Sequence, residues 1–172
     1  MTLQSSGAIS LNQIHVEAGG TSGSSVSLND SDVRRLLNRS DEATSEFDDF
    51  YGATRYVVTA GSGSSGGITF TGYKSTSPAI GSRTPTSLTW TSATWSGLYY
   101  KLSGSPYTYN LLLNGSGSGS NSGFTTMGLG SSQNFAWTSA SFTGSSGIFS
   151  NWAWGSASNL LTVNAVRDVY FY

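Results

Sequence analysis

The stretch Ser96-Gly97-Leu98-Tyr99-Tyr100-Lys101-Leu102 alternates large apolar residues with small or polar ones. Successive side chains of a strand point to opposite sides, so Leu98, Tyr100 and Leu102 would share one face. The stretch is therefore predicted to be a strand with one buried face.

Similar short runs recur along the rest of the chain, separated by Gly, Ser, Asn or Pro. Several alternate in the same way, for example Ile68 with Phe70, Leu88 with Trp90 and Val163 with Ala165. About seven strands at this spacing, with no crossover helix between them, indicate an antiparallel β-sandwich rather than a parallel α/β fold. The predicted strands of the sandwich are 68–74, 87–91, 96–102, 107–113, 124–129, 134–142 and 160–172, and a further strand, 55–59, precedes them. The last run ends in the uncharged Val169-Tyr170-Phe171-Tyr172, so we predict a paired inner strand or an intersubunit contact there.

Charge divides the chain unevenly. Residues 1–55 carry twelve of the seventeen charged residues, and only five follow Tyr56. We therefore predict a mainly β chain with a small N-terminal α/β anchoring module over 1–55, a strand and Gly/Ser linker over 56–67, and a Ser/Thr/Gly-rich β-sandwich domain over 68–172. The run from Asn114 to Gly123 is predicted to be a long flexible hairpin, and Pro78 and Pro85 bracket an irregular connection.

Composition excludes several classes of protein. The net charge of −1 and pI near 5.6 do not suggest nucleic acid or an anionic membrane as the main partner, since both attract an excess of Lys and Arg. The chain has no Cys, and its start lacks the features of a secretory signal. The apolar run Leu111-Leu112-Leu113 is too short to cross a bilayer. Disorder is disfavoured because aromatic residues are abundant and charged residues are few. We expect a soluble protein made in a cytoplasm.

A serine followed three residues later by Gln or Asp occurs three times in the first part of the chain, with Ser10, Ser27 and Ser45. At this spacing the later side chain can reach back to the backbone N–H of a capping serine, so each copy can begin a helical turn. The middle copy continues furthest.

A helix is predicted after Asp30 or Ser31, ending near 38–40. Val33, Leu36 and Leu37 would form its apolar stripe. The arginines that follow suit a solvated face near a helix C-terminus better than a phosphate site.

The order of motifs in this first part resembles the N-terminal module of many virion structural proteins of tailed bacteriophages. The residues concerned are Ser6-Gly7-Ala8-Ile9-Ser10-Leu11-Asn12, a β-prone stretch that ends at Val26-Ser27-Leu28, the helix with Asp32-Val33-Arg34-x-Leu36, and Phe47-x-x-Phe50-Tyr51-Gly52. The chain departs from that family at Thr44-Ser45-Glu46, where Ile-Ser-Leu is frequent, and in its double arginine.

The later part of the chain is similar to small β domains of phage tail-associated proteins. The similarity lies in 96–100, 112–115, 122–127, 139–142 and Trp152-Ala153-Trp154. The resemblance implies a virion component, and it does not define a location within the particle.

Motifs for catalysis are weak. Gly61-x-Gly63-x-x-Gly66 and Gly63-Ser64-Ser65-Gly66-Gly67 match a dinucleotide fingerprint and a nucleophile elbow, but both motifs need a following helix, and a strand is predicted instead. The single histidine, His15, fits a surface or interface residue better than a catalytic base.

The carboxylates also give no paired catalytic site. Asp48 and Asp49 are adjacent, so their side chains diverge, and Asp168 is the only later one. With no His/Cys cluster and no EF-hand spacing, we expect no metal, no cofactor and no enzymatic activity.

Aromatic residues of the later part allow two interpretations. Most of them can fill the sandwich core or an interface between subunits, because aromatic side chains supply large buried areas. Alternatively, some could form an exposed platform that stacks on a host-surface sugar or receptor. The spacing Trp152-Ala153-Trp154 would place both indoles on one face of a strand. The candidates for that contact are Trp90, Trp95, Trp152 and Trp154.

These observations favour a non-enzymatic structural protein of a tailed phage virion, associated with the tail, baseplate or fibre and assembled in the host cytoplasm. It would bind other virion subunits and form a threefold or sixfold homo-oligomer. Residues predicted to pack its anchor or interface are Ile9, Leu11, Ile14, Val33, Leu36, Leu37, Phe47, Phe50 and Tyr51. The alternatives are a carbohydrate- or receptor-binding module and a capsid decoration protein.

Overall fold

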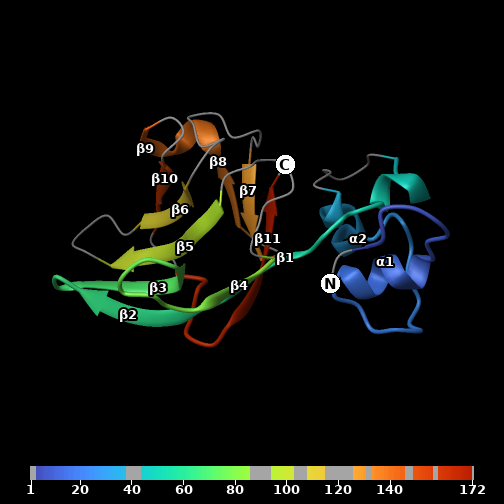
Figure 1. Cartoon of the computed structure of the whole chain (residues 1–172), viewed down its shortest axis with the longest axis horizontal. Helices are drawn as coiled ribbons and strands as arrows, with labels where there is room; N and C mark the ends of the chain where they lie inside the picture. The colour runs from blue at the N-terminus through green and yellow to red at the C-terminus, as the bar shows by residue number, and fades with distance from the viewer. Residues whose placement is uncertain are drawn as a thin grey trace.

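A group of short helices and a β-sandwich lie side by side in the molecule, joined by the segment that leads into β1 (Figure 1). This computed structural model describes residues 3–37, 44–85, 94–102, 108–114, 126–130, 133–145, 149–156 and 159–171. The described residues between 3 and 55 are called the front module below, and those from 56 onward form the sandwich.

The front module begins with α1 (Leu11–Glu17), which is capped as predicted. The Ser10 hydroxyl accepts the Gln13 N–H over 3.2 Å, and the Gln13 side chain accepts the Ser10 N–H over 2.8 Å. Together these bonds satisfy backbone donors that the first turn of a helix leaves unpaired. The first of the three predicted capped turns is therefore confirmed.

The other two capped turns are present in altered form. Asp30 accepts the Ser27 N–H over 2.8 Å and precedes α2 (Ser31–Leu36), as expected. The third cap is shifted by one residue, because Asp49 accepts from the Glu46 N–H at the start of η1 (Phe47–Phe50). Within its described residues the front module forms these helices and turns, and the β-prone stretch ending at Val26–Leu28 is not a strand.

Two antiparallel sheets pack against each other in the sandwich, which confirms the predicted fold class. One sheet has the order β4-β1-β11-β7-β8 and the other the order β2-β3-β5-β6-β10-β9. The first contains β1 (Tyr56–Thr59), β4 (Ser82–Thr84), β7 (Thr126–Leu129), β8 (Gln133–Ala136) and β11 (Val166–Phe171). The second contains β2 (Gly61–Ser65), β3 (Ile68–Lys74), β5 (Thr94–Leu102), β6 (Thr108–Asn114), β9 (Ser141–Ser145) and β10 (Phe149–Gly155).

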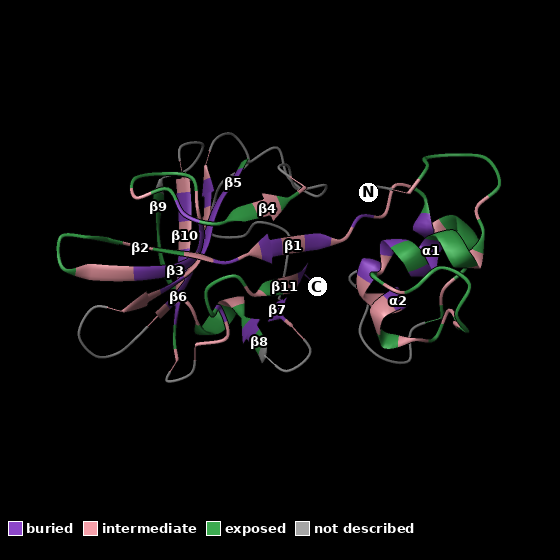
Figure 2. Cartoon of the chain, turned by 90° about the horizontal axis from the view of Figure 1, so that it is seen from below, coloured by how far each residue is buried: buried purple, intermediate pink, exposed green. Residues whose placement is uncertain are grey.

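Aromatic and aliphatic side chains from both sheets fill the space between them. The centre of this core includes Trp95, which makes edge-to-face contacts with Tyr56, Tyr73 and Phe171 at centroid distances of 6.1, 6.2 and 6.2 Å. Burial of such large rings supplies much of the apolar area that stabilises a domain rich in Ser and Gly. Figure 2 shows, in contrast, mostly exposed residues along the edge strands β2 and β4.

The predicted Gly/Ser linker is wrong over 61–65, because these residues form β2 and pair with β3. The chain passes from one sheet to the other at Ala60, between β1 and β2. Glycine is required in β2 by close packing rather than by flexibility: a Cβ on Gly61 would lie 2.4 Å from the Gly81 backbone nitrogen. A Gly/Ser run can thus be a strand where a neighbouring backbone approaches it.

Two predicted strands have different limits. The run 134–142 is not one strand, since the helical turn η2 (Trp137–Ser139) separates β8 from β9. In the run 160–172, strand β11 begins only at Val166, because Asn164 adopts a left-handed φ of 66° and its N–H bonds to the Ala60 carbonyl over 2.8 Å. The uncapped C-terminal run is nevertheless an inner strand, as predicted, with β1 and β7 on its two sides.

The connection after Asn114 is not a hairpin. Strand β6 belongs to one sheet and β7 to the other, so the chain crosses between sheets there. Strand β4 was not predicted, and β10 was recognised only as the Trp152-Ala153-Trp154 pair of same-face indoles. The predicted strand 87–91, and residues 115–123 of the predicted hairpin, lie outside the described residues.

Candidate functional site

The front module has an apolar core of its own. Ile14 of α1, Val33 and Leu36 of α2, and Phe50 of η1 are buried together, separately from the core of the sandwich. Short helices are marginal alone, so their packing around these side chains holds the module together. Seven partly buried residues pack against this cluster: Leu3, Ile9, Ala18, Val26, Leu28, Leu37 and Ala53.

The structure divides the nine predicted anchor residues into three groups. Ile14, Val33, Leu36 and Phe50 are buried, and Ile9, Leu11 and Leu37 are half-buried. Phe47 and Tyr51 instead remain 43% and 38% exposed. Except for Leu11, the residues of the first two groups form or pack against the apolar core of the module, whereas Phe47 and Tyr51 leave aromatic surface exposed.

Tyr51 is fixed in place although it is exposed. Its hydroxyl donates to the Gly7 carbonyl, and the Gly52 N–H donates to the Gln4 carbonyl over 3.1 Å. The Leu3 N–H in turn donates to the Ala53 carbonyl over 3.0 Å. The first described residues therefore run beside 51–53, and the exposed aromatic surface of Phe47 and Tyr51 lies on a tied segment.

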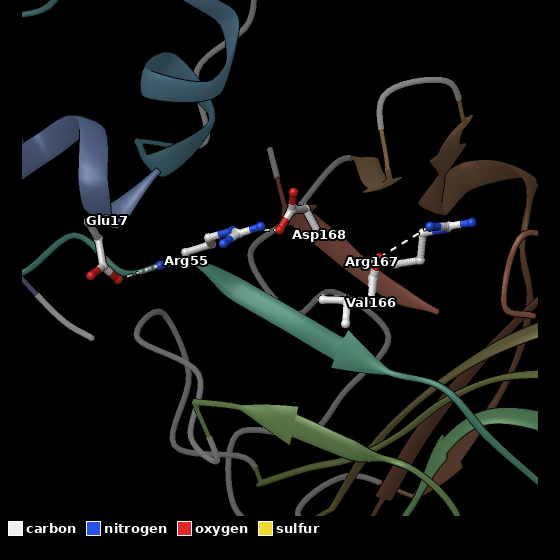
Figure 3. A network of polar contacts seen from close by, with 5 residues as sticks. All are labelled: Glu17, Arg55, Val166, Arg167 and Asp168. Carbon is white, nitrogen blue, oxygen red and sulfur yellow. Dashed lines mark hydrogen bonds and ion pairs between the residues drawn. The ribbon is translucent and has the colours of Figure 1, made fainter. Parts of the chain in front are cut away.

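A polar junction joins the front module to the sandwich (Figure 3). The Arg55 Nε donates to Asp168 Oδ1 over 2.6 Å, and the Arg55 backbone N–H donates to Glu17 Oε1 over 3.2 Å. Arg55 therefore connects the end of α1 with β11. The hydrogen bond that Arg55 donates to Asp168 raises the pKa of the guanidinium above its usual value, so Arg55 is positively charged in the pair.

A second pair of side chains crosses the same junction. The guanidinium carbon of Arg35, on α2, lies 4.9 Å from the centre of the Tyr170 ring on β11. Burial raises the pKa of Tyr170 to about 12, so its hydroxyl is neutral near pH 7. The arrangement combines a cation–π contact with the Arg55–Asp168 ion pair, and both reach from the front module to β11.

The junction encloses only a small recess of about 10 Å³. That volume is close to the minimum for one water molecule, so the recess has no room for a cofactor or substrate. Its lining consists of Ala18, Asp32, Arg35, Leu36, Thr54, Arg55, Tyr56, Val169 and Tyr170. The junction is therefore a structural contact.

Sequence reasoning missed the junction. Arg55 was assigned only to a strand, and Asp168 was considered only as a catalytic carboxylate without a partner. One signal was available, because Asp168 is the only carboxylate after Asp49 and lies in a predicted inner strand. An acidic residue in such a position needs a partner, since burial of an unpaired charge is costly.

His15 was predicted to be a surface or interface residue, and the first of these two interpretations is wrong. It is 8% exposed, and its Nε2 lies 2.8 Å from the Ser24 hydroxyl. That hydroxyl donates to the Thr21 carbonyl over 2.7 Å, so it accepts from His15 and is not activated as a nucleophile. His15 thus holds the loop after α1 in place.

The proposed tryptophan platform does not exist at three of its four positions. Trp95, Trp152 and Trp154 are at most 3% exposed and belong to the core of the sandwich. The two indoles of β10 do share a face, but it is the face turned toward the other sheet. Their assignment as receptor contacts is therefore wrong, and Trp90 lies outside the described residues.

The remaining polar motifs have structural roles. Asp49 caps η1, and Ser64 and Ser65 of the elbow-like pattern belong to β2, which is followed by β3 and not by a helix. In the part of the chain that the structure describes, no group of three or more His, Cys, Asp or Glu side chains could hold a metal ion. Nor does any helix there have the length and hydrophobicity needed to cross a membrane.

No family model matches the chain, and no curated protein or solved structure shows significant similarity to it. The fold therefore defines the class of protein only as a β-sandwich with a small helical module. Function has to be argued from the geometry of the module, its exposed aromatic residues and its junction.

Proposed function

We propose that the chain is a non-enzymatic structural component of a tailed phage virion, associated with the tail, baseplate or fibre. In this proposal the front module docks on neighbouring virion subunits, and the sandwich projects from the docking point or contacts further copies. The proposal begins from the motif order of the first fifty residues, which resembles the N-terminal module of such virion proteins.

The observation that carries the proposal is the independent packing of the front module. Ile14, Val33, Leu36 and Phe50 form a core that the sandwich does not share. A module that is packed by itself can keep its shape while its outer surface binds another subunit. Phe47 and Tyr51 supply aromatic surface there, and aromatic side chains are frequent at protein interfaces.

The polar junction supports the same proposal. Contacts of Arg55 and Arg35 with β11 connect the module to the sandwich through specific side chains. Such a connection sets the direction in which the sandwich leaves the docking point. Many copies on one particle would then bind strongly even if each contact were weak.

Incorporation into particles tests the proposal. Mass spectrometry of purified virions should detect the chain, and a particle reconstruction should place residues 3–55 against another subunit. Phe47→Glu should reduce incorporation, because it puts a charge into the docking surface. Val163→Glu is a matched control, since Val163 is an exposed apolar residue of the sandwich.

Circular dichroism and thermal unfolding must first show that both variants fold. If the two variants were incorporated equally, Phe47 would not be part of the docking surface. Absence of the chain from purified particles would contradict the virion proposal itself.

The alternative roles have less support. A carbohydrate-binding module would need exposed aromatic rings, and three of the four candidate tryptophans are buried. A capsid decoration protein would differ in copy number per particle, which quantitative mass spectrometry measures. Hydrolysis of host polysaccharide by the purified chain would favour an enzyme instead.

A further inference from the structure

Strand β9 is the last strand of the six-stranded sheet among the described residues (Figure 1). Within the described residues, β10 is the only strand that pairs with it. A strand in this position presents backbone N–H and C=O groups in a row, which can pair with another chain. Proteins commonly protect such edges with charges, prolines or short length.

Strand β9 has none of these protections. Its sequence, Ser141-Phe142-Thr143-Gly144-Ser145, contains no charge and no proline, and the chain has no charged residue between Lys101 and Arg167. The edge strand β4 of the other sheet differs, because it has three residues, includes Arg83 and is followed by Pro85. The opposite edge of that sheet, β8, has four residues.

An exposed aromatic ring lies on the same edge. Phe142 is 41% exposed, although its ring contacts that of Trp152, directly opposite on β10, at a centroid distance of 5.5 Å. The ring also lies against Gly144, where an added Cβ would come within 2.7 Å of the Phe142 Cζ. One side of Phe142 is therefore packed, and the other is left uncovered among the described residues.

The sequence of β9 is self-complementary when two copies are paired antiparallel about Thr143. Ser141 then faces Ser145 of the second copy, Thr143 faces its counterpart, and Phe142 faces Gly144. An aromatic ring opposite a glycine avoids a steric clash and covers the glycine backbone, and the facing Thr143 side chains form a favourable cross-strand pair. Such pairing about a twofold axis is the isologous contact of a symmetric dimer.

We infer that β9 pairs with β9 of a second copy of this chain, which extends the six-stranded sheet across a twofold dimer. The contact supplies backbone hydrogen bonds along five residues and covers Phe142 of both copies. It does not depend on the virion proposal. It also differs from the expected threefold or sixfold symmetry, which would require a further surface.

The other edge of this sheet is the competing site. Strand β2 also has five uncharged residues. They are all Gly or Ser, so the strand has no large apolar side chain to cover. Pro78 and Ile80 lie against Gly63 on one of its faces. Strand β9 alone among the described edge strands combines an uncharged edge with a half-exposed aromatic ring.

Sedimentation velocity of the full chain over a range of concentrations tests the inference. We expect a reversible dimer, weak because a single strand buries little surface. Thr143→Lys should weaken it about fivefold or more, because it places two like charges opposite each other at the twofold axis. Thr143 is exposed, so the monomer should tolerate the change.

Matched variants make the test specific. Ser64→Lys places the same charge on the exposed edge strand β2 and should leave the dimer unchanged. Thr143→Glu alone should also weaken the dimer, and mixing it with Thr143→Lys should restore association through opposite charges. Circular dichroism should show that each variant folds.

Three results would overturn the inference. One is a wild-type chain that remains monomeric at about 1 mM. Another is a dimer that is weakened by Ser64→Lys and not by Thr143→Lys, which would move the contact to β2. The third is a failure of the mixed Lys and Glu variants to associate more strongly than either alone.

Discussion

Arg55 and Asp168 form an ion pair with an Nε–Oδ1 distance of 2.6 Å, although 113 positions of sequence separate them. Arg55 immediately precedes β1, and Asp168 lies in β11, the neighbouring strand. The backbone N–H of Arg55 also reaches Glu17 at the end of α1. One residue therefore connects the front module, the first strand and the last strand.

Asp168→Asn should lower the free energy of unfolding by about 1 kcal/mol, because the pair is partly exposed and solvent screens it. Urea unfolding followed by circular dichroism measures the change. Asp48→Asn, at an exposed carboxylate of the front module, is the control and should have a smaller effect. Equal losses in the two variants would show that the junction adds no specific stability.

Tyr170 should make the sandwich sensitive to alkali. Its folded pKa is raised by burial from 10.0 to about 12, whereas in the unfolded chain it returns to its ordinary value. Between these values the unfolded chain binds fewer protons, so stability is full below about pH 10 and falls as the pH rises toward 12.

The comparison of wild type with Tyr170→Phe isolates this effect. The variant should lose less stability between pH 9.5 and 11.5. Urea unfolding at several pH values gives the dependence of the free energy of unfolding on pH for each protein. Tyr99 and Tyr109, whose pKa values burial also raises, should leave some alkaline loss in both proteins. If the free energy of unfolding fell equally with pH in both proteins, the pKa of Tyr170 would be the same in the folded and unfolded chain.

Trp152→Ala should destabilise the sandwich by about 3–5 kcal/mol, because it leaves a cavity where a buried indole packed. Val163→Ala, at a residue that is 54% exposed, should change stability by less than about 0.5 kcal/mol. Thermal or chemical unfolding separates these outcomes. A stable Trp152→Ala variant that lost glycan binding would instead favour the receptor-binding alternative.

Ser10→Ala should cost the front module about 1 kcal/mol, because it removes the hydroxyl that accepts the Gln13 N–H. Ser25→Ala, at an exposed serine between α1 and α2, serves as the control. Far-UV circular dichroism during thermal unfolding follows the helices. If both variants unfolded like wild type, the capping box would not contribute to module stability.

Several features were predictable because local patterns control them. The capping box of Ser10 and Gln13 follows from residue types at a fixed spacing. Strand β3 follows from its alternation between Gly66-Gly67 and the turn-prone run 75–78. The sandwich class follows from many short strands without crossover helices. The inner position of the C-terminal strand agrees with the uncharged run Val169-Tyr170-Phe171-Tyr172 at its end.

Other features depend on contacts that are distant in sequence. Only the folded chain shows that Gly61–Ser65 is a strand, because its partner β3 and the approach of Gly81 determine the conformation. Only the folded chain also shows which aromatic residues reach the surface. Phe47 is exposed, whereas Phe50, Trp152 and Trp154 are buried.

The amino-acid sequence by itself determined the helix starts, most strands and the division into a charged front module and an almost uncharged sandwich. Tertiary structure alone decided which strands share a sheet, which aromatic side chains reach the surface, and that Arg55 meets Asp168. The physical reason is range: hydrogen-bond spacing and side-chain periodicity act between near neighbours, whereas burial and ion pairing depend on where the whole chain brings remote residues together.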